Sequence, residues 1–136
     1  MNVKVEINSK QNGKFTVNCL SSNKTFNVDV SKDSVSLEGP NPLELFLSAL
    51  GSCTGVYAEK YLIQHSIEFK NLKIEAAARF SNEPPSRLVD IKLKVSTDAK
   101  LDKDAKEIFL RFMKNCPIHN TIINTKEIDI NLNDNI

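Results

Sequence analysis

Two cysteines of this 136-residue chain, Cys53 and Cys116, stand in contexts that favour thiol chemistry. Cys53 lies in the stretch GSCTGVYAEKYLIQH, between Gly51 and Gly55, in a segment whose other residues favour a buried helix. Each glycine inside a helix costs about 1 kcal/mol relative to alanine. Two explanations for the glycines stay open. They allow close approach of another backbone or of a second copy of the helix, or they leave space beside the sulfur for a small substrate.

Cys116 has a different setting, because Pro117 follows it directly. Proline favours the first helical position, so we expect Cys116 at a helix N-terminus, where backbone N–H groups and the helix dipole stabilise a thiolate. His119 follows three residues later on the same face and is a candidate to exchange a proton with that sulfur. The C-x-x-H spacing also suits a metal pair, but no second pair of this kind occurs, so we expect no metal site and no cofactor.

The third cysteine, Cys19, alternates with Phe15 and Val17, which predicts a small buried hydrophobe in a strand. The chain begins with the alternating stretch V-K-V-E-I, which has neither the basic start nor the apolar run of a secretory signal. We therefore expect a cytoplasmic protein. That compartment keeps thiols reduced, which argues against a stable disulfide framework.

The elements that must position these cysteines follow from hydrophobic periodicity. Period-two alternation over residues 3–7, 15–19 and 26–30, with Asn12-Gly13 as a hairpin turn after the first run, predicts a β-meander. Asn41 and Pro42 favour the cap and first turn of a helix of about twenty residues, which is apolar on nearly every side and therefore buried. Alternation over residues 72–80 and 89–95 predicts a hairpin.

After the hairpin, Asp102 begins an amphipathic helix, Pro117 begins a short one, and Ile128, Ile130 and Leu132 predict a final strand. This order predicts an α+β fold in one domain over residues 1–136. The net charge of +1 comes from scattered residues, which argues against nucleic acid as a partner. The uncharged run 45–58 is shorter than the ~20 apolar residues that a membrane span requires, so we expect no membrane partner.

The stretches GPNPLELFLSALGSC and NCPIHNT resemble the superfamily of osmotically inducible protein C (OsmC) and organic hydroperoxide resistance proteins. The resemblance covers nearly the whole chain and implies an OsmC-like fold and an intertwined homodimer with active sites at the subunit interface. It implies a thiol-dependent peroxidase of the stress response. Cys53 would be the peroxidatic thiolate that reduces an organic hydroperoxide, Cys116 would resolve its sulfenic acid, and a dithiol reductant would complete the cycle.

The chain departs from the peroxidase members at two positions. Those members activate the first cysteine with an arginine from the N-terminal sheet, whereas the first arginine here is Arg79. Without a nearby cation, we expect desolvation on the apolar helix to raise the pKa of the Cys53 thiol. They carry a glutamate directly after the Asn-Pro pair, where this chain has Leu43, with Glu44 one residue later. We therefore keep Glu44 and His119 as candidate supporting residues, and we keep an alternative function open. In that alternative the protein binds a small apolar or thiol-bearing molecule and lacks peroxidase activity.

Overall fold

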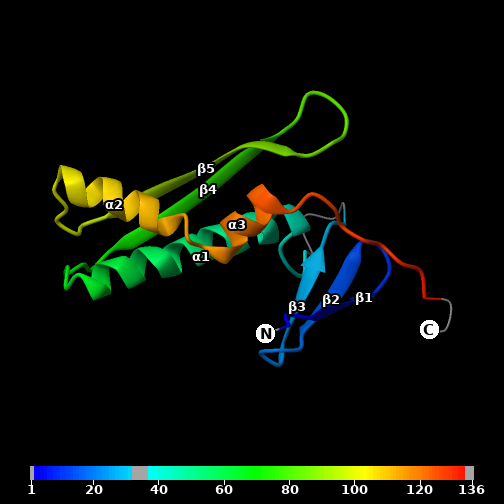
Figure 1. Ribbon diagram of the computed structural model, residues 1–136. Coiled ribbons are helices and arrows are strands. Elements are labelled where there is room, and N and C mark those ends of the chain that lie inside the picture. Colours follow the sequence, from blue (N-terminus) through cyan, green and yellow to red (C-terminus); the bar gives the residue numbers. More distant parts are fainter. Residues whose placement is uncertain (1, 32–36, 134–136) are drawn as a thin grey trace. The chain divides into compact units, whose positions relative to one another are not determined.

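The computed structural model of the protein describes residues 2–31 and 37–133, and confirms the α+β class (Figure 1). Contacts within the chain gather in two compact units, residues 1–48 and residues 49–136. We describe each unit by itself. The expectation of a single domain over residues 1–136 stays a prediction.

The first unit contains the predicted β-meander. Strands β1 (Val5–Ser9), β2 (Lys14–Cys19) and β3 (Lys24–Asp29) form an antiparallel sheet in the order β1-β2-β3. The turn between β1 and β2 has positive φ angles at Asn12 (57°) and Gly13 (79°). These two residue types adopt this left-handed region most readily, which is why the Asn-Gly pair marks the turn in the sequence.

The segment that leaves β3 is held by one buried carboxylate. Asp29 accepts hydrogen bonds from the backbone N–H groups of Ser31 (2.8 Å) and Glu38 (3.1 Å). Gly39 then packs against the backbone of Asn27 so closely that an added Cβ would lie 1.9 Å from its carbonyl oxygen. Only glycine fits there, and this contact fixes the path of the chain before the long helix.

The long helix α1 spans Pro42–Gln64 and begins with a reciprocal cap. The side chain of Asn41 accepts the N–H of Glu44 (2.9 Å), and the carboxylate of Glu44 accepts the N–H of Asn41 (3.2 Å). The predicted cap is thereby confirmed. No helix in the described part of the chain is both long and apolar enough to cross a membrane.

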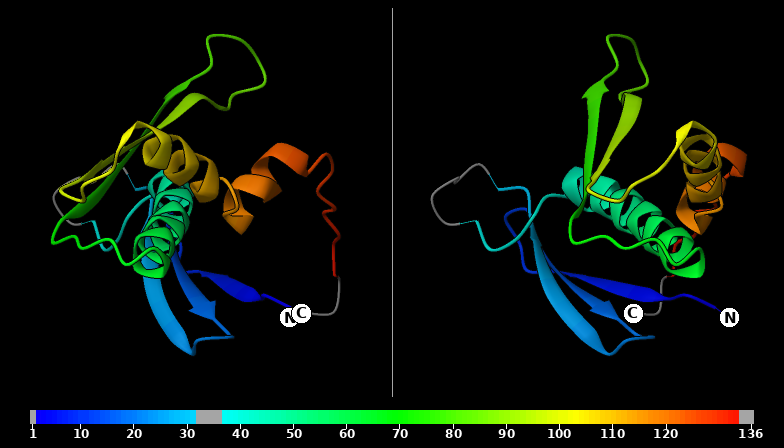
Figure 2. Two further views of the ribbon diagram at one scale, coloured as in Figure 1. Left: turned by 60° about the vertical axis from the view of Figure 1, so that its left-hand side comes forward. Right: turned by 90° about the vertical axis from the view of Figure 1, so that its left-hand side faces the viewer.

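The second unit places a hairpin and two helices around the rest of α1. Strands β4 (Leu72–Phe80) and β5 (Leu88–Thr97) pair antiparallel as predicted. Helix α2 (Lys103–Met113) begins at the predicted cap Asp102, and α3 spans Pro117–Asn124. Figure 2 shows the hairpin and α2 beside α1, with the tip of the hairpin extending beyond the helices.

The core of the second unit lies between α1, α2 and the hairpin. Tyr61 contacts Phe109 and Phe112 of α2, with ring centroids 5.3 and 5.6 Å apart. Leu72 and Val95 of the hairpin pack against the same cluster. Its fully or largely buried members are Ala58, Tyr61, Leu62, Phe109 and Met113.

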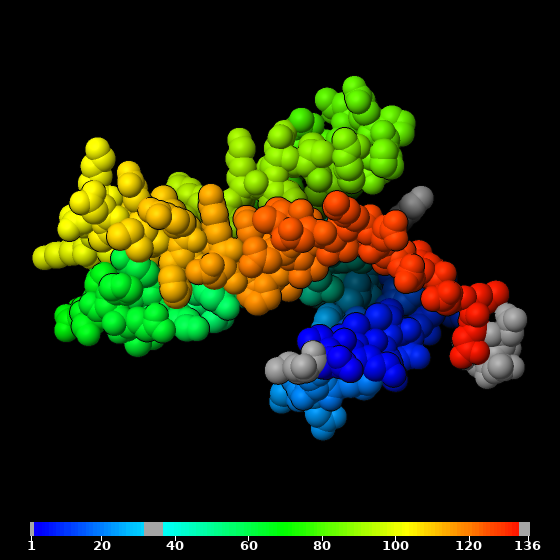
Figure 3. All heavy atoms as spheres, viewed as in Figure 1, coloured from blue at the N-terminus to red at the C-terminus, as the bar shows by residue number. Residues whose placement is uncertain are grey.

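The predicted final strand is not formed. Residues 125–133, which follow α3 in Figure 3, contain no strand, and Ile128, Ile130 and Leu132 are 83%, 93% and 88% exposed. A strand needs a neighbour that satisfies its backbone N–H and C=O groups. The alternating pattern indicates an extended segment, but no described strand lies beside it to form hydrogen bonds, so the predicted strand is wrong.

Candidate functional site

The structure brings Cys53 and Cys116 together, although they are distant in the sequence. Cys53 lies on α1 and is half-buried, whereas Cys116 lies at the start of α3 and is fully buried. The Cys53 thiol donates a hydrogen bond to the Cys116 sulfur. Both cysteines are free thiols. Two neighbouring thiols are the arrangement from which a disulfide forms once one sulfur is oxidised.

Cys116 occupies the predicted position at a helix N-terminus. It is the N-cap of α3, Pro117 is the first helical residue, and the Cys116 sulfur accepts the backbone N–H of His119 at 3.4 Å. The prediction for His119 concerned its ring, however. His119 reaches this sulfur with its backbone N–H and not with its ring, which instead lines a neighbouring pocket.

The surroundings of Cys53 favour its protonated form. Burial raises the pKa of the Cys53 thiol, and its hydrogen bond to Cys116 raises the pKa further because that bond exists only while Cys53 carries its proton. The backbone N–H of Ile118 lowers the pKa in part, since it donates to the Cys53 sulfur. The predicted desolvation of this thiol on an apolar helix is thereby confirmed. Cys53 is therefore a weak nucleophile at neutral pH unless a further positive charge approaches it.

The two arginines of the hairpin are engaged within the hairpin. Arg79 forms an ion pair with Asp90, and its Nη1 donates to the carbonyl oxygen of Phe80 at 3.2 Å. Arg87 donates to the carbonyl oxygen of Pro85 at 3.0 Å. Among the described residues, no cation contributes to the pKa of Cys53.

Glu44, the other candidate supporting residue, lies in the first unit. Its carboxylate accepts the N–H of Asn41 in the helix cap described above. The structure thus gives Glu44 a helix-capping contact. Its predicted role in supporting the thiols remains a prediction.

The glycines that flank Cys53 face strand β4. A Cβ added to Gly51 would meet Ala76 at 3.7 Å and Ile74 at 3.8 Å, and one added to Gly55 would meet Ile74 at 3.5 Å. These are ordinary van der Waals distances, so alanine fits at both positions. The strand therefore approaches this face of α1, but the contacts within the chain do not require glycine there.

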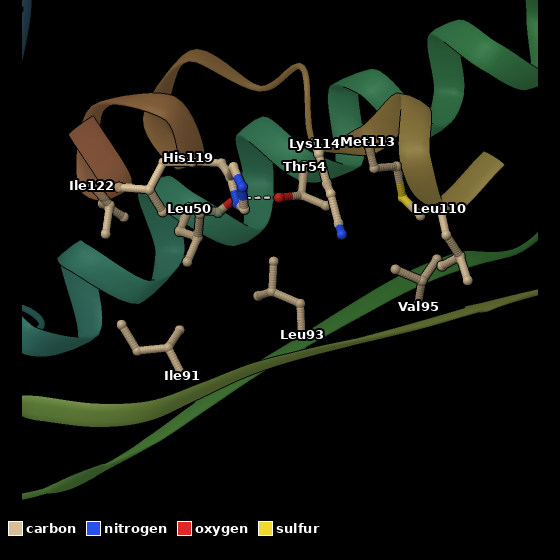
Figure 4. Close-up of a pocket in the computed structure, with 11 residues that line it drawn as sticks. Leu50, Thr54, Ile91, Leu93, Val95, Leu110, Met113, Lys114, His119 and Ile122 are labelled. Atoms are coloured by element: carbon tan, nitrogen blue, oxygen red, sulfur yellow. Dashed lines mark hydrogen bonds between the residues drawn. The ribbon is translucent and has the colours of Figure 1, made fainter. Parts of the chain in front are cut away.

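A pocket of about 520 Å³ lies within the second unit (Figure 4). Leu50 and Thr54 of α1 form one wall, and α2, α3 and β5 complete it. Leu50 is three residues, and Thr54 one residue, from Cys53 along α1. Most of the lining is aliphatic, and the polar exceptions are Thr54, Lys114 and His119.

A metal centre finds no support in the described ranges, 2–31 and 37–133. No group of three or more His, Cys, Asp or Glu side chains in these ranges is arranged to hold a metal ion. The described residues of this site offer two neighbouring thiols, of which Cys116 lies at a helix N-terminus.

Comparison with known proteins identifies the family. The model of the OsmC-like protein family matches residues 31–132, which is well over half of the chain. The chain belongs to this family. No curated protein sequence matches the chain significantly.

Solved structures share the OsmC-like fold at low sequence identity. An OsmC-like protein from Mycoplasma pneumoniae superposes with a TM-score of 0.78 at 20% identity, over 91% of this chain and 89% of that one. The organic hydroperoxide resistance protein OhrB of Bacillus subtilis gives 0.66 at 18% identity, over 91% and 92%. A protein from Psychrobacter arcticus, described as a putative osmotic stress induced and detoxification response protein, gives 0.74 at 17% identity, over 89% and 88%. At these identities the likeness shows the fold.

Two features of this OsmC-like protein escaped the sequence analysis. Pro117 indicated a helix N-terminus for Cys116, but nothing in the sequence indicated that Ile118 would donate its N–H to Cys53. The pocket that Lys114 and His119 share was also missed. The only signal in the sequence was that two basic side chains lie close to Pro117. That signal does not indicate a pocket until β5 is known to form the opposite wall.

Proposed function

We propose that the protein is a thiol-dependent peroxidase that reduces organic hydroperoxides. The observation that carries the proposal is the hydrogen-bonded pair of Cys53 and Cys116, with Cys116 at the N-cap of α3. One thiol alone would stop at a sulfenic acid, which further hydroperoxide oxidises irreversibly. A second thiol next to it provides the reversible route, because it converts the sulfenic acid to a disulfide.

In the proposed cycle, the Cys53 thiolate attacks one oxygen of the hydroperoxide and the O–O bond breaks. Cys53 becomes a sulfenic acid, and the departing alkoxide takes up a proton and leaves as the alcohol. The Cys116 sulfur then attacks the sulfenic sulfur, which forms the Cys53–Cys116 disulfide and releases water. A dithiol reductant reduces this disulfide to the two thiols and is itself oxidised to a disulfide.

The raised pKa of Cys53 implies that the cycle needs a positive charge from outside the described contacts. We propose that a second copy of the chain supplies it in a homodimer. Support comes from the apolar side chains that one copy leaves exposed, among them Val56 (60%) and Ile63 (67%) on α1 and Ile130 (93%) in the C-terminal segment. Light scattering should then give twice the chain mass of 15.2 kDa; a stable monomer would remove this source of charge.

The names of structural neighbours agree with the proposal. One is an organic hydroperoxide resistance protein of Bacillus subtilis, and another is an organic hydroperoxide resistance protein of Elizabethkingia anophelis, which aligns with a TM-score of 0.69 at 14% identity. We accordingly propose a role in the response to oxidative stress. We also propose that the protein works in the cytoplasm, where dithiol reductants are maintained.

Consumption of tert-butyl hydroperoxide with dithiothreitol tests the proposal. Cys53→Ser should lower turnover on the order of 100-fold or more, because it removes the nucleophile. Cys19→Ser is the matched control, since it removes a thiol from the first unit, and it should leave turnover unchanged. Equal turnover of the wild type and Cys53→Ser would refute the peroxidase.

A second candidate function is binding of a small apolar or thiol-bearing molecule without peroxidase chemistry. The raised pKa of Cys53, with no described cation nearby, favours this candidate. It predicts no turnover with any of several dithiols, while the folded protein and its free thiols remain intact. The activity measurement above therefore separates the two functions.

A further inference from the structure

The two thiols of the candidate site differ in how far a reagent from solvent can reach them. Cys53 is half-buried, whereas Cys116 is fully buried and its sulfur accepts the backbone N–H of His119 at 3.4 Å. A molecule from solvent therefore meets Cys53 first. Cys116 acts in a second step, on whatever has become bonded to the neighbouring Cys53 sulfur.

The described residues around Cys53 supply a hydrogen-bond donor but no positive charge. The backbone N–H of Ile118 donates to the Cys53 sulfur, and no cation in the described part of the chain contributes to the pKa of this thiol. Arg79 and Arg87 are engaged within the hairpin. Along α1, residues 45–58 carry no charge. Within one copy of the chain, a reaction at Cys53 is therefore favoured when its leaving group is a stable anion without the help of a cation.

Hydroperoxides and compounds with sulfur–sulfur bonds differ in this leaving group. Breaking an O–O bond expels an alkoxide, a strong base that needs a proton or a cation as it departs. Breaking an S–S bond expels a sulfur anion, a much weaker base, and exchange is faster when the leaving thiol has a lower pKa. In a trisulfide, RS–S–SR, attack on an outer sulfur expels a persulfide anion, RSS⁻, which is a weaker base than a thiolate. A trisulfide therefore suits the described surroundings of Cys53 better than a hydroperoxide does.

We propose that Cys53 and Cys116 reduce uncharged organic trisulfides as a second activity. The Cys53 thiolate attacks an outer sulfur of RS–S–SR, which forms a mixed disulfide between Cys53 and SR and releases RSS⁻. This anion takes up the proton that Cys53 lost and leaves as RSSH. The Cys116 thiol then attacks the Cys53 sulfur, forms the Cys53–Cys116 disulfide and passes its proton to the departing RS⁻, which leaves as RSH. A dithiol reductant restores both thiols and is itself oxidised to a disulfide.

The inference uses the same two thiols as the proposed peroxidase, but it does not rest on hydroperoxide turnover. The peroxidase needs a positive charge, which we propose comes from a second copy of the chain. The trisulfide reaction needs no such charge, because its leaving group is already a stable anion. The rates measured with the two kinds of substrate can therefore differ, and each can fail without the other.

Single-turnover oxidation of the reduced full-length protein tests the proposal. After removal of the reductant, the protein is mixed at neutral pH with dimethyl trisulfide or with tert-butyl hydroperoxide, quenched with acid and mapped for the Cys53–Cys116 disulfide. The rate constant should be at least about tenfold larger for the trisulfide, because its leaving group is the weaker base. Dimethyl disulfide, which expels a thiolate, should react more slowly than the trisulfide.

Cys116→Ser separates the two steps of the reaction. Serine is a favoured N-cap residue, so this variant keeps the start of α3. With dimethyl trisulfide it should stop at a methylthio adduct on Cys53, which peptide mass spectrometry identifies. Cys53→Ser should form neither this adduct nor the disulfide, and Cys19→Ser should react at the rate of the wild type.

The outcomes distinguish this inference from the proposed peroxidase. Disulfide formation with the hydroperoxide but not with the trisulfide would overturn the inference and leave the peroxidase standing, as would a hydroperoxide rate equal to or above the trisulfide rate. Reaction with the trisulfide alone would support the inference and count against the peroxidase. No reaction with either substrate would overturn both.

Discussion

The two units of this protein place the same residue types in opposite circumstances. Cys19 of the first unit lies half-buried on β2, opposite Val5 of β1 and Lys24 of β3, whereas Cys53 of the second unit has another thiol as its neighbour. Gly39 of the first unit is sterically required, whereas Gly51 of the second has room for a methyl group. Residue type is therefore a weak guide to role, and the atoms around each residue decide it.

The special residues of the first unit and those of the second have different explanations. In the first unit the chain itself explains each special residue, since Gly39 meets the Asn27 backbone and Asp29 holds two N–H groups. In the second unit the chain explains the contact between the thiols. It does not explain the glycines beside Cys53. Space for a substrate and contact with a second copy of the chain therefore both stay open as explanations.

The largest effect on the free energy of unfolding is expected for Gly39→Ala. The added Cβ would lie 1.9 Å from the Asn27 carbonyl oxygen, so the backbone must move, and we expect a destabilisation of about 3 kcal/mol. Hydrogen exchange of the β2–β3 amides should accelerate accordingly. Unchanged exchange in this variant would show that the contact between Gly39 and Asn27 is not tight in solution.

A smaller effect concerns the reactivity of Cys53 toward iodoacetamide. Because burial and the bond to Cys116 raise its pKa, the reactive thiolate forms only at higher pH, and the rate should still be rising above pH 9.0. At pH 8 the native thiol should react about tenfold more slowly than the same thiol in urea-unfolded protein. Peptide mass spectrometry distinguishes Cys53 from Cys19 and Cys116. A rate that reaches its plateau below pH 7 would contradict the account and would imply a nearby cation.

The smallest effect, of opposite sign to that of Gly39→Ala, is expected for Gly51→Ala. Its Cβ fits beside Ala76 and Ile74, and alanine favours the helix, so the free energy of unfolding in urea should rise by about 1 kcal/mol. Gly55→Ala should behave alike, because its nearest neighbour is Ile74 at 3.5 Å. A loss of stability in either variant would mean that β4 packs more tightly against this face of α1 than these distances indicate.

Much of the fold could be predicted from the sequence because its signals are local. The Asn12-Gly13 turn, the Asn41 cap of α1 and the Asp102 cap of α2 each depend on residues within a few positions, and all three are confirmed. The prediction of a final strand was wrong for the opposite reason. Its alternating pattern over residues 128–132 is local, but pairing requires a distant partner that the pattern does not specify.

The candidate site was predictable to a lesser extent. The N-cap position of Cys116 followed from Pro117, and the desolvation of Cys53 followed from the apolar helix around it. The N–H donated by Ile118 and the direction of the His119 ring could not be predicted, because both depend on how α3 packs against α1. The contacts of a short helix with its neighbours are tertiary, and sequence periodicity does not contain them.

Oxidation with one equivalent of hydroperoxide, followed by peptide mapping without reduction, tests the central claim most directly. The account predicts a single Cys53–Cys116 disulfide, because these two thiols are neighbours in the fold, with Cys19 still open to alkylation. A link that involves Cys19, or oxidation of Cys53 to a sulfinic acid without any link to Cys116, would contradict it.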